Sequence, residues 1–175
     1  MEKIKLLHLF AGTGSVEQAL NNLGIEYENV AHCEIDKYAD MTYKMLHGEN
    51  SINLGDITKV DFTKLKDKGI NLIVGGFPCQ TFSIAGKRAG FNDLRGTMCF
   101  YMANAIKILQ PKYWMFENVY GLVTHNSGKT LKYILEIFSD LGYEITMDLL
   151  NSKDFGIPQN RLRLFCIGRR IENGQ

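Results

Sequence analysis

The sequence has little of what marks membrane, disulfide-stabilised or metal-binding proteins. It contains three prolines, one tryptophan and no apolar run approaching the roughly 20 residues that span a bilayer. The first residues, MEKIKLLHLF, hold too short a hydrophobic stretch for a secretory signal. No C-x-x-C pair occurs among the cysteines, which argues against a zinc or redox motif and favours a reducing compartment. We therefore expect a cytoplasmic protein with no membrane partner and no metal.

The sequence also lacks a large charge of either sign. Its net charge of +1 provides no overall attraction for nucleic acid. Its cations do cluster locally, and most such clusters are solvated surface, so their position must decide their meaning. The clustered cations are Lys87, Arg88 and Arg95, and then Arg161, Arg163, Arg169 and Arg170. The length, 175 residues, predicts a single domain over residues 1–175 that buries roughly 70% of its extended-chain surface.

Short runs of Ile, Leu and Val alternate with segments of helical periodicity, the pattern of a parallel sheet covered on both faces. We expect strands over residues 4–10, 29–34, 71–75, 113–116, 144–150 and 163–167. We expect helices over residues 15–23, 37–47, 98–109 and 129–141, with Ser15 as the first N-cap and Gly24 following that helix. The last connection is too short for a covering helix, which predicts an antiparallel strand at the carboxyl-terminal end of a mostly parallel, Rossmann-like α/β fold.

Gly12 and Gly14 lie between the first predicted strand and helix, where glycines permit a tight turn beside free N–H groups. Taken alone, this G-x-G could mark a plain strand-to-helix turn. Glu34 lies about 20 residues further on, where a carboxylate can bind ribose hydroxyls. The third glycine of a dinucleotide fingerprint is replaced by Glu17, whose carboxylate would repel a pyrophosphate. The pattern favours a cofactor with a ribose and no pyrophosphate over an NAD-dependent oxidoreductase.

Two further motifs have simpler interpretations. Asp56, in GDI, is expected at the tip of the next unit, where an aspartate can equally serve as a turn-forming residue. HNSGKT resembles the end of a phosphate-binding loop, but that motif requires glycine where this chain has Val123. We therefore interpret HNSGKT as the capped start of the fourth helix.

The stretch NLIVGGFPCQTFSIAGKRAGFNDLRGT presents Cys79 directly behind Pro78, at the carboxyl end of a buried strand. Ligands bind at that edge of an open α/β sheet. The proline stiffens the exit from the strand, and the long loop that follows is of a kind that is usually functional or disordered. A buried, inert role remains the interpretation for Cys33, Cys99 and Cys166.

Other reactive side chains are expected at the same edge. Glu117 and Asn118 follow the next predicted strand, and Arg161 and Arg163 are two residues apart on an extended segment, so that both point to one side. A thiol, a carboxyl group and two guanidinium groups at successive strand ends predict a catalytic site.

The ordered motifs LFAGTGS, EID, GDI, GGFPCQTFSIAGKRAGFNDLRGT, ENV and QNRLR resemble those of the DNA (cytosine-5)-methyltransferases along essentially the whole chain. The resemblance implies the fold of S-adenosylmethionine-dependent methyltransferases and the activity of a DNA (cytosine-5-)-methyltransferase of the restriction-modification type. The base must leave the duplex to be reached, so double-stranded DNA is the implied partner.

The resemblance also implies roles for individual residues. Cys79 would add to C6 of cytosine, and Glu117 would bind N3 and the exocyclic amine. Asn118 would hold the local geometry and Arg161 would contact the base carbonyl, while Arg163 would favour the thiolate. The methyl group would pass from S-adenosylmethionine to C5, leaving S-adenosylhomocysteine.

The remaining implied positions fall into two groups. Cofactor contacts would come from Phe10, Ala11, Gly12, Gly14, Ser15, Glu34, Ile35, Asp56, Ile57 and Pro78. DNA contacts would come from Gln80, Ser83, Lys87, Arg88 and Arg95 in the long loop.

The sequence departs from the family after QNRLR. The family continues with a target-recognition region and a last segment that completes the cofactor pocket, whereas this chain ends IGRRIENGQ. We therefore expect a second polypeptide to supply target recognition, and apolar surface near the first strand and helix to be exposed. The alternative is a non-catalytic or degenerate subunit of the same fold that binds cofactor, DNA or both.

Overall fold

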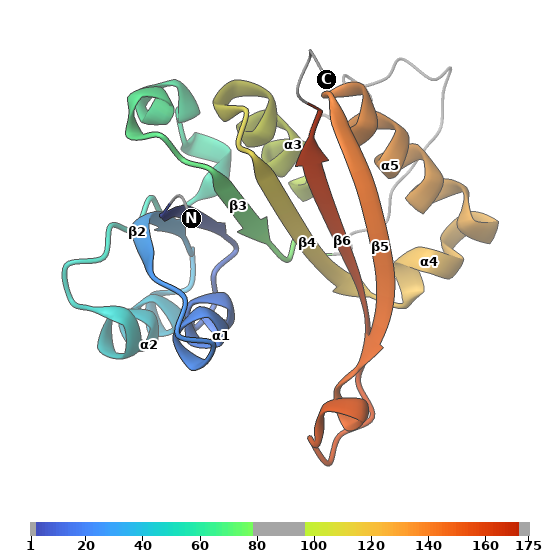
Figure 1. The fold of residues 1–175 in the computed structure, drawn as a ribbon, viewed down its shortest axis with the longest axis horizontal. Coiled ribbons are helices and arrows are strands. Elements are labelled where there is room, and N and C mark those ends of the chain that lie inside the picture. Colours follow the sequence, from blue (N-terminus) through green and yellow to red (C-terminus); the bar gives the residue numbers. More distant parts are fainter. Residues whose placement is uncertain (1–2, 79–96, 172–175) are drawn as a thin grey trace.

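The computed structural model describes residues 3–78 and 97–171. Its centre is a six-stranded sheet of order β2-β1-β3-β4-β6-β5, and Figure 1 shows the strands side by side. The pairs β1–β2, β1–β3 and β3–β4 are parallel, while β6 is antiparallel to both β4 and β5. The predicted mostly parallel sheet with an antiparallel strand near its carboxyl-terminal end is confirmed. The strands are β1 (Ile4–Leu9), β2 (Tyr27–Cys33), β3 (Leu72–Gly75), β4 (Tyr113–Val119), β5 (Tyr143–Asn151) and β6 (Leu162–Arg170).

The four predicted helices are present, and two of them have the predicted bounds. The α-helices are α1 (Ser15–Asn22), α2 (Lys37–His47), α3 (Met98–Leu109), α4 (Gly121–Thr124) and α5 (Lys129–Asp140). Short 3-10 helices occur at Ile57–Lys59, Phe62–Lys68, His125–Gly128 and Ser152–Phe155. The sequence does not predict these or α4, because segments of three to seven residues show too little periodicity. Within residues 3–78 and 97–171, no helix has the length and apolarity needed to cross a membrane.

The start of α1 differs from the prediction. Its N-cap is Gly14, in the left-handed conformation at φ 84, and no side chain caps the helix. A Cβ atom at Gly14 would lie 2.3 Å from Nε2 of His47. The turn therefore requires glycine for both backbone conformation and space, and Ser15 becomes the first helical residue instead of the cap.

The strand β4 is longer than predicted. Glu117 and Asn118 lie inside it instead of after it, because its antiparallel pairing with β6 continues to the pairs Glu117–Phe165 and Asn118–Leu164. Since successive side chains of a strand point to opposite faces, Glu117 and Asn118 serve different sides of the sheet.

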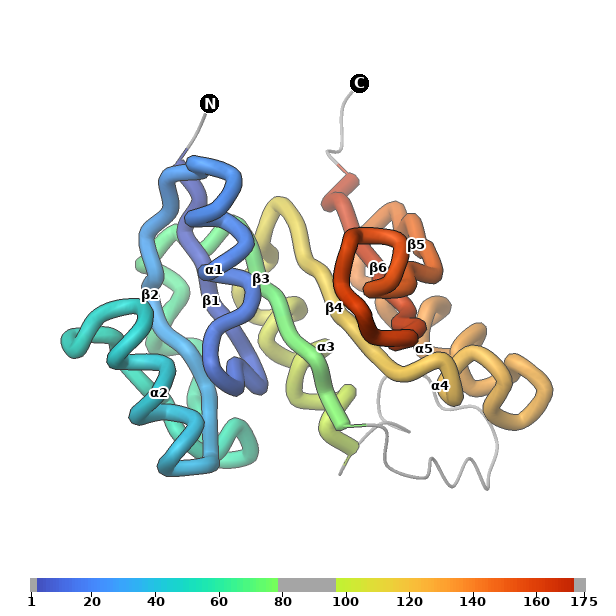
Figure 2. Tube along the Cα trace, turned by 90° about the horizontal axis from the view of Figure 1, so that it is seen from below, coloured from blue at the N-terminus to red at the C-terminus, as the bar shows by residue number. Residues whose placement is uncertain are grey.

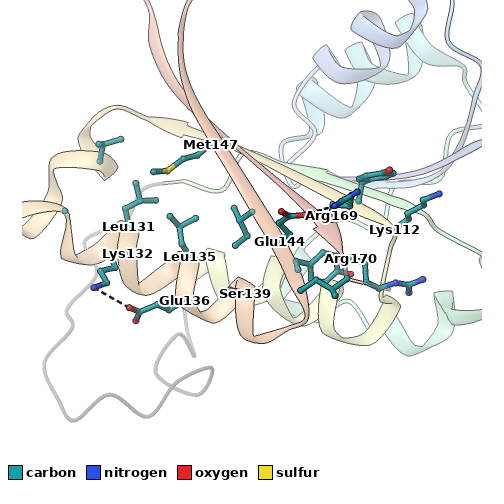
Figure 3. Close-up of a pocket in the computed structure, with 16 residues that line it drawn as sticks. Lys112, Leu131, Lys132, Leu135, Glu136, Ser139, Glu144, Met147, Arg169 and Arg170 are labelled. Atoms are coloured by element: carbon teal, nitrogen blue, oxygen red, sulfur yellow. Dashed lines mark hydrogen bonds and ion pairs between the residues drawn. The ribbon is translucent and has the colours of Figure 1, made fainter. Parts of the chain in front are cut away.

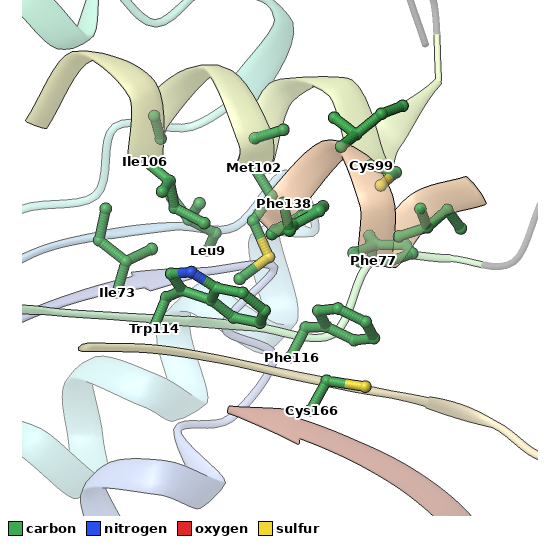
Figure 4. Packing of buried hydrophobic residues seen from close by; sticks show 14 of the residues in the cluster. Leu9, Ile73, Phe77, Cys99, Met102, Ile106, Trp114, Phe116, Phe138 and Cys166 are labelled. Carbon is green, nitrogen blue, oxygen red and sulfur yellow. The ribbon is translucent and has the colours of Figure 1, made fainter. Parts of the chain in front are cut away.

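The helices cover the sheet on two faces (Figures 1 and 2). On one face, Leu20 of α1 packs with Leu6 and Val74. On the other, the large core contains residues of β1, β3, β4, α3 and α5. Figure 4 shows the aromatic centre of this core, where Trp114 and Phe116 lie against Phe138 of α5.

The face that α1 covers is only partly protected. Tyr113 and Val119 of β4 and Ile167 of β6 point to this side and are exposed by 39%, 39% and 46%. Within the described residues, no helix packs over this part of the sheet (Figure 1), which leaves these three apolar side chains partly exposed. We refer to these three residues as the open face.

Candidate functional site

A cavity of about 730 Å³ lies where the first turn approaches the β5–β6 hairpin. Phe10–Gly12 and Ser15 form one wall, and Glu117 of β4 lies on another. The hairpin closes the third side. The cavity brings together residues that are more than a hundred positions apart in the sequence. They are predicted cofactor contacts on one side and predicted catalytic residues on the other. Its other lining residues are His8, Thr13, Val16, Gly75, Gly76, Met115, Leu150, Ser152, Phe155, Ile157, Arg161, Arg163 and Phe165.

Glu117 and Arg163 form an ion pair in this cavity, with Nε of Arg163 2.8 Å from Oε1 of Glu117. Both side chains are only partly exposed, by 34% for Glu117 and 21% for Arg163. The other carboxyl oxygen, Oε2, lies beside Gly76, where a Cβ atom would be only 3.2 Å away. Because Gly76 has no side chain, there is space beside Oε2, the oxygen of Glu117 that does not pair with Arg163.

Asn118 anchors the chain just before the predicted nucleophile. Its side chain is buried, and Nδ2 donates a hydrogen bond to the backbone carbonyl of Phe77 at 2.9 Å. Its Oδ1 accepts from the amide of Val119 at 2.9 Å. Phe77 precedes Pro78, so the amide fixes the point at which the chain leaves β3. The predicted Cys79 lies outside the described residues, as do the predicted DNA contacts Gln80, Ser83, Lys87, Arg88 and Arg95.

Arg161 lies just before β6 and lines the same cavity as Arg163. Its backbone is fixed, because its amide donates to Oδ1 of Asn151 at 3.1 Å and its carbonyl accepts from Ser152 at 3.2 Å. Its side chain is exposed. The hairpin thus presents one guanidinium group paired with Glu117 and a second that is more open to solvent.

Glu34, the predicted ribose-binding residue, lies next to the first turn. Its Oε2 accepts a hydrogen bond from the amide of Gly12 at 2.7 Å, and its Oε1 accepts from the amide of Asp36 at 2.8 Å. These bonds hold the carboxylate beside the turn, where its remaining lone pairs can accept from ligand hydroxyls. Phe10, at φ 56, ends β1 and directs the chain into that turn.

Asn53 supports Glu34 and was not identified from the sequence. Its Oδ1 accepts from the amide of Glu34 at 3.1 Å, and its Nδ2 donates to the carbonyl of Glu34 at 3.0 Å. The same Oδ1 accepts from the amide of Gly55 at 2.8 Å. The sequence gives no signal for Asn53, because an asparagine in a loop is typical of any turn. Only its position beside β2 in the structure shows its role.

The other predicted cofactor contacts occupy different environments. Asp56 caps the 3-10 helix Ile57–Lys59, and its Oδ1 accepts from the amide and hydroxyl of Thr58 at 3.0 and 2.8 Å. These bonds lower the pKa of the Asp56 carboxyl. Ile57 is buried in the large core, whereas Ile35 is 76% exposed. The turn-forming role of Asp56 is therefore present, and Ile35 has the more accessible apolar surface of the two isoleucines.

Glu17 does not face a ligand at the turn, so the repulsion expected from it was wrong. It is fully buried and accepts from Nδ1 of His8 at 2.8 Å and from the hydroxyl of Tyr43 at 2.5 Å. Burial would raise the pKa of the Glu17 carboxyl, but the hydrogen bond and charge of His8, with the Tyr43 hydroxyl, hold it below its usual value. Asn29 donates in turn to the Tyr43 oxygen at 2.6 Å. The Glu17 carboxylate can be buried because these partners supply its hydrogen bonds.

A larger cavity, of about 1300 Å³, lies between α5 and the β5–β6 pair and contains none of the predicted catalytic or cofactor residues (Figure 3). Leu131 and Leu135 of α5 line it opposite Met147 of β5. Two of the charged residues that line it bond to each other: Arg169 donates a hydrogen bond to Glu144 at 2.7 Å. Nowhere in the described part of the chain do three His, Cys, Asp or Glu side chains gather as a metal site would require.

Curated relatives match nearly the whole chain. An orphan methyltransferase, M.Rho11sI of Bacillus phage rho11s, is 48% identical over 179 residues, covering 100% of this chain and 35% of the relative. The type II methyltransferase M1.ScrFI of Lactococcus lactis subsp. cremoris is 44% identical over 166 residues, covering 95% of this chain and 41% of the relative. The chain thus spans well under half the length of these two relatives.

Solved structures show the same fold. A DNMT2 mutant from Spodoptera frugiperda superposes with a TM-score of 0.78 at 26% identity, covering 96% of this chain and 50% of its own. The S. pombe Dnmt2 methyltransferase superposes with a TM-score of 0.74 at 22% identity, covering 99% and 51%. The family model for C-5 cytosine-specific DNA methylases matches residues 4–175. This chain therefore belongs to the C-5 cytosine-specific DNA methylase family.

Proposed function

We propose that this chain is the catalytic and cofactor-binding part of an enzyme that transfers a methyl group from S-adenosylmethionine to C5 of cytosine in DNA. The observation that carries the proposal is the single cavity that joins the Phe10–Gly12 turn to the Glu117–Arg163 pair. A donor held at the turn and a base held at the carboxylate would meet there.

The carboxyl group of Glu117 is suited to hold the target base. Arg163 occupies Oε1, which leaves Oε2 beside Gly76 to accept a hydrogen bond from the exocyclic amine of cytosine. Thymine has a carbonyl in that position and would leave the acceptor without a donor, so the geometry favours cytosine. Arg161, the more exposed arginine of the cavity, is free to approach the base carbonyl.

Cys79 follows directly on the segment that Asn118 anchors at Phe77. We propose that its thiolate adds to C6, which moves electron density to C5 and makes that carbon nucleophilic. C5 would then accept the methyl group that bound S-adenosylmethionine supplies, with S-adenosylhomocysteine as the product. Loss of the C5 proton and elimination of the Cys79 thiolate restore the aromatic ring. A base stacked in a duplex cannot enter such a cavity, so it must be flipped out.

The residues present fit S-adenosylmethionine. The carboxylate of Glu34 is fixed beside the first turn by the amides of Gly12 and Asp36, and its remaining lone pairs can accept from ribose hydroxyls. Gly14 permits the left-handed turn that brings the backbone of Thr13 and Ser15 to the cavity. When bound, the cofactor supplies the electrophilic methyl group; the chain supplies its orientation.

Target recognition is proposed to come from polypeptide outside this chain. The described residues form a sheet with its helices and offer no separate module for reading base edges in a groove. The open face of Tyr113, Val119 and Ile167 is a surface on which further polypeptide can pack. We therefore propose that a second polypeptide supplies the recognition region and packs on the open face.

The test is covalent trapping. The chain is incubated with tritiated S-adenosylmethionine and a duplex carrying 5-fluorocytosine at many positions, so that no target sequence need be known. Fluorine cannot leave as a proton does, so an enzyme that has transferred its methyl group remains bound. A labelled complex that survives denaturation and is absent from Cys79→Ser supports the proposal.

Cys166→Ala is the matched control. Burial raises the pKa of the Cys166 thiol to about 12, so it is protonated at neutral pH and cannot replace Cys79 as nucleophile. Loss of the complex in this variant, with its fold intact, would contradict the assignment. Cofactor binding by the wild-type chain with no trapped complex, alone or with added polypeptide, would favour the non-catalytic subunit instead.

A further inference from the structure

His8 lines the cavity beside the first turn, and the fully buried Glu17 lies behind it, yet neither residue belongs to the predicted site. His8 is only 4% exposed and lies on β1, two residues before the turn begins at Phe10. Its ring lines the cavity with Gly12, Ser15 and Gly75. A buried imidazole that reaches a cavity is placed to contact what the cavity holds.

The hydrogen bonds fix which atom of the imidazole is available. Nδ1 of His8 lies 3.0 and 2.8 Å from the two carboxyl oxygens of Glu17. The hydroxyl of Tyr43 also donates to this carboxylate. An ionised carboxylate only accepts, so Nδ1 must carry the proton that it donates. Nε2, which has no hydrogen-bond partner among the described residues, is the ring nitrogen left for a ligand.

The charge of the pair decides what kind of ligand it favours. If the imidazole is neutral, Nε2 carries a lone pair and the pair has a charge of −1. If the imidazole is protonated, the pair has a charge of zero. In the first state Nε2 accepts a hydrogen bond from a cation with a buried negative charge behind it, whereas in the second state Nε2 donates and the pair has no net charge to attract a cation; the neutral state is the one that fits a cationic donor.

We infer that His8, held by Glu17, binds the α-ammonium group of the amino-acid part of S-adenosylmethionine. The inference rests on the proposed function, since the ligand must be this cofactor. The carboxylate of the same amino acid belongs instead beside the amides of Ser15 and Val16, at the start of α1 on the cavity wall. The ammonium group would then be bound by the His8–Glu17 pair and the carboxylate by the amides at the start of α1. His8 is thus a cofactor-binding residue.

Three ligands separate this inference from a structural role. S-adenosylhomocysteine has both the ammonium and the carboxylate, decarboxylated S-adenosylmethionine has only the amine, and 5′-methylthioadenosine has neither. Dissociation constants are measured by calorimetry for the wild-type 175-residue chain and for Glu17→Gln, which keeps the shape of the side chain and removes its charge. We expect S-adenosylhomocysteine and decarboxylated S-adenosylmethionine to bind Glu17→Gln about tenfold or more weakly than they bind the wild type, because one charge-assisted hydrogen bond is weakened. The affinity for 5′-methylthioadenosine should change less than twofold.

His8→Phe is the second variant, because its ring retains the volume and loses both nitrogens. We expect His8→Phe to lose affinity for the same two ligands and to keep its affinity for 5′-methylthioadenosine. Circular dichroism and the melting temperature show whether the variant is folded. Asn53→Ala is the control: it acts through Glu34, so it should weaken all three ligands equally.

The outcomes distinguish the two proposals. Equal losses for all three ligands in a folded Glu17→Gln would overturn the inference and assign the pair a structural role. A loss confined to S-adenosylhomocysteine would assign His8 to the carboxylate and overturn it as well. If the wild-type chain bound none of the three ligands, the proposed cofactor and this inference would both fail.

Discussion

Glu117 and Arg163 pair diagonally across β4 and β6, because Glu117 is directly opposite Phe165 and Arg163 is directly opposite Val119. Diagonal neighbours lie further apart than direct partners, and only a long side chain spans them. The reach of the arginine is what allows Nε to meet Oε1 while Oε2 remains beside Gly76.

Replacing Arg163 with lysine should reduce methyl transfer more than stability. Lysine keeps the charge but loses the planar guanidinium group that orients the carboxylate of Glu117. We expect the turnover number to fall at least about tenfold, whereas partly exposed ion pairs contribute only about 1 kcal/mol or less to folding. Single-turnover assays and thermal melts measure the two effects. A melting temperature that fell steeply while turnover persisted would assign the pair to folding instead.

Glu34→Ala should weaken S-adenosylmethionine binding by roughly 1–3 kcal/mol, through loss of charge-assisted hydrogen bonds to the ribose. Asn53→Ala should weaken it through the same carboxylate, because Asn53 holds the backbone of Glu34 at both its N–H and C=O groups. The two effects should therefore be less than additive in the double variant, as calorimetry can show. Glu28→Ala, at an exposed pair with Lys5, should leave binding unchanged. Full additivity would mean that Asn53 does not act through Glu34.

Gly168→Ala should destabilise the fold. The new methyl group would lie 2.1 Å from Cε2 of Trp114, which is fully buried against Phe138 and Tyr143. Forced repacking of a core costs typically 1–3 kcal/mol, and urea denaturation should reveal a loss of that order. Gly121→Ala is the matched control, since the closest side-chain atom there is 3.8 Å away. Equal stability of the two variants would contradict the packing observed around Trp114.

The stability of the chain should fall as the pH drops below about 6.5, the pKa of an unperturbed histidine. Burial lowers the pKa of His32, and its hydrogen bond to Asp40 only partly offsets this. Because the unfolded chain binds the proton first, the stabilisation is complete above the unfolded pKa and is lost as the pH falls toward the folded one. Melting temperatures between pH 7.5 and 5.5 test this. His32→Gln, which does not titrate, should show a shallower decline; an unchanged slope would exclude His32 as its source.

The sequence predicted the elements whose signals are local. The bounds of α2 and α3 agree with the structure, because Gly48 and Pro111 mark their ends and their apolar spacing is regular. The antiparallel strand followed from the short connection before β6. The exact start of α1 did not, because a glycine in a left-handed conformation competes with the better capping side chain of Ser15.

The site was predictable where residues lie at strand ends and not where contacts cross the fold. Glu34 and Glu117 were proposed because each follows a predicted strand and a parallel sheet gathers such ends at one edge. Arg163 was proposed because it and Arg161 lie two residues apart on a predicted extended segment. The roles of all three stay predictions. His8 and Glu17 lie nine residues apart, on β1 and on the helix that follows it, but neither residue type alone signals that the two side chains bond to each other. The inward direction of Glu17 could not be deduced without the position of Tyr43.

The alternation of β4 places a constraint on chain length within the catalytic region. Glu117 faces the cavity while its neighbour Asn118 holds Phe77 from the other side. Insertion or deletion of a single residue before this pair would exchange their directions, turning the amide toward the cavity and the carboxylate into the core. Engineers who recombine this chain with other family members should therefore choose crossover points outside Tyr113–Val119, since an error of one position there disables both functions at once.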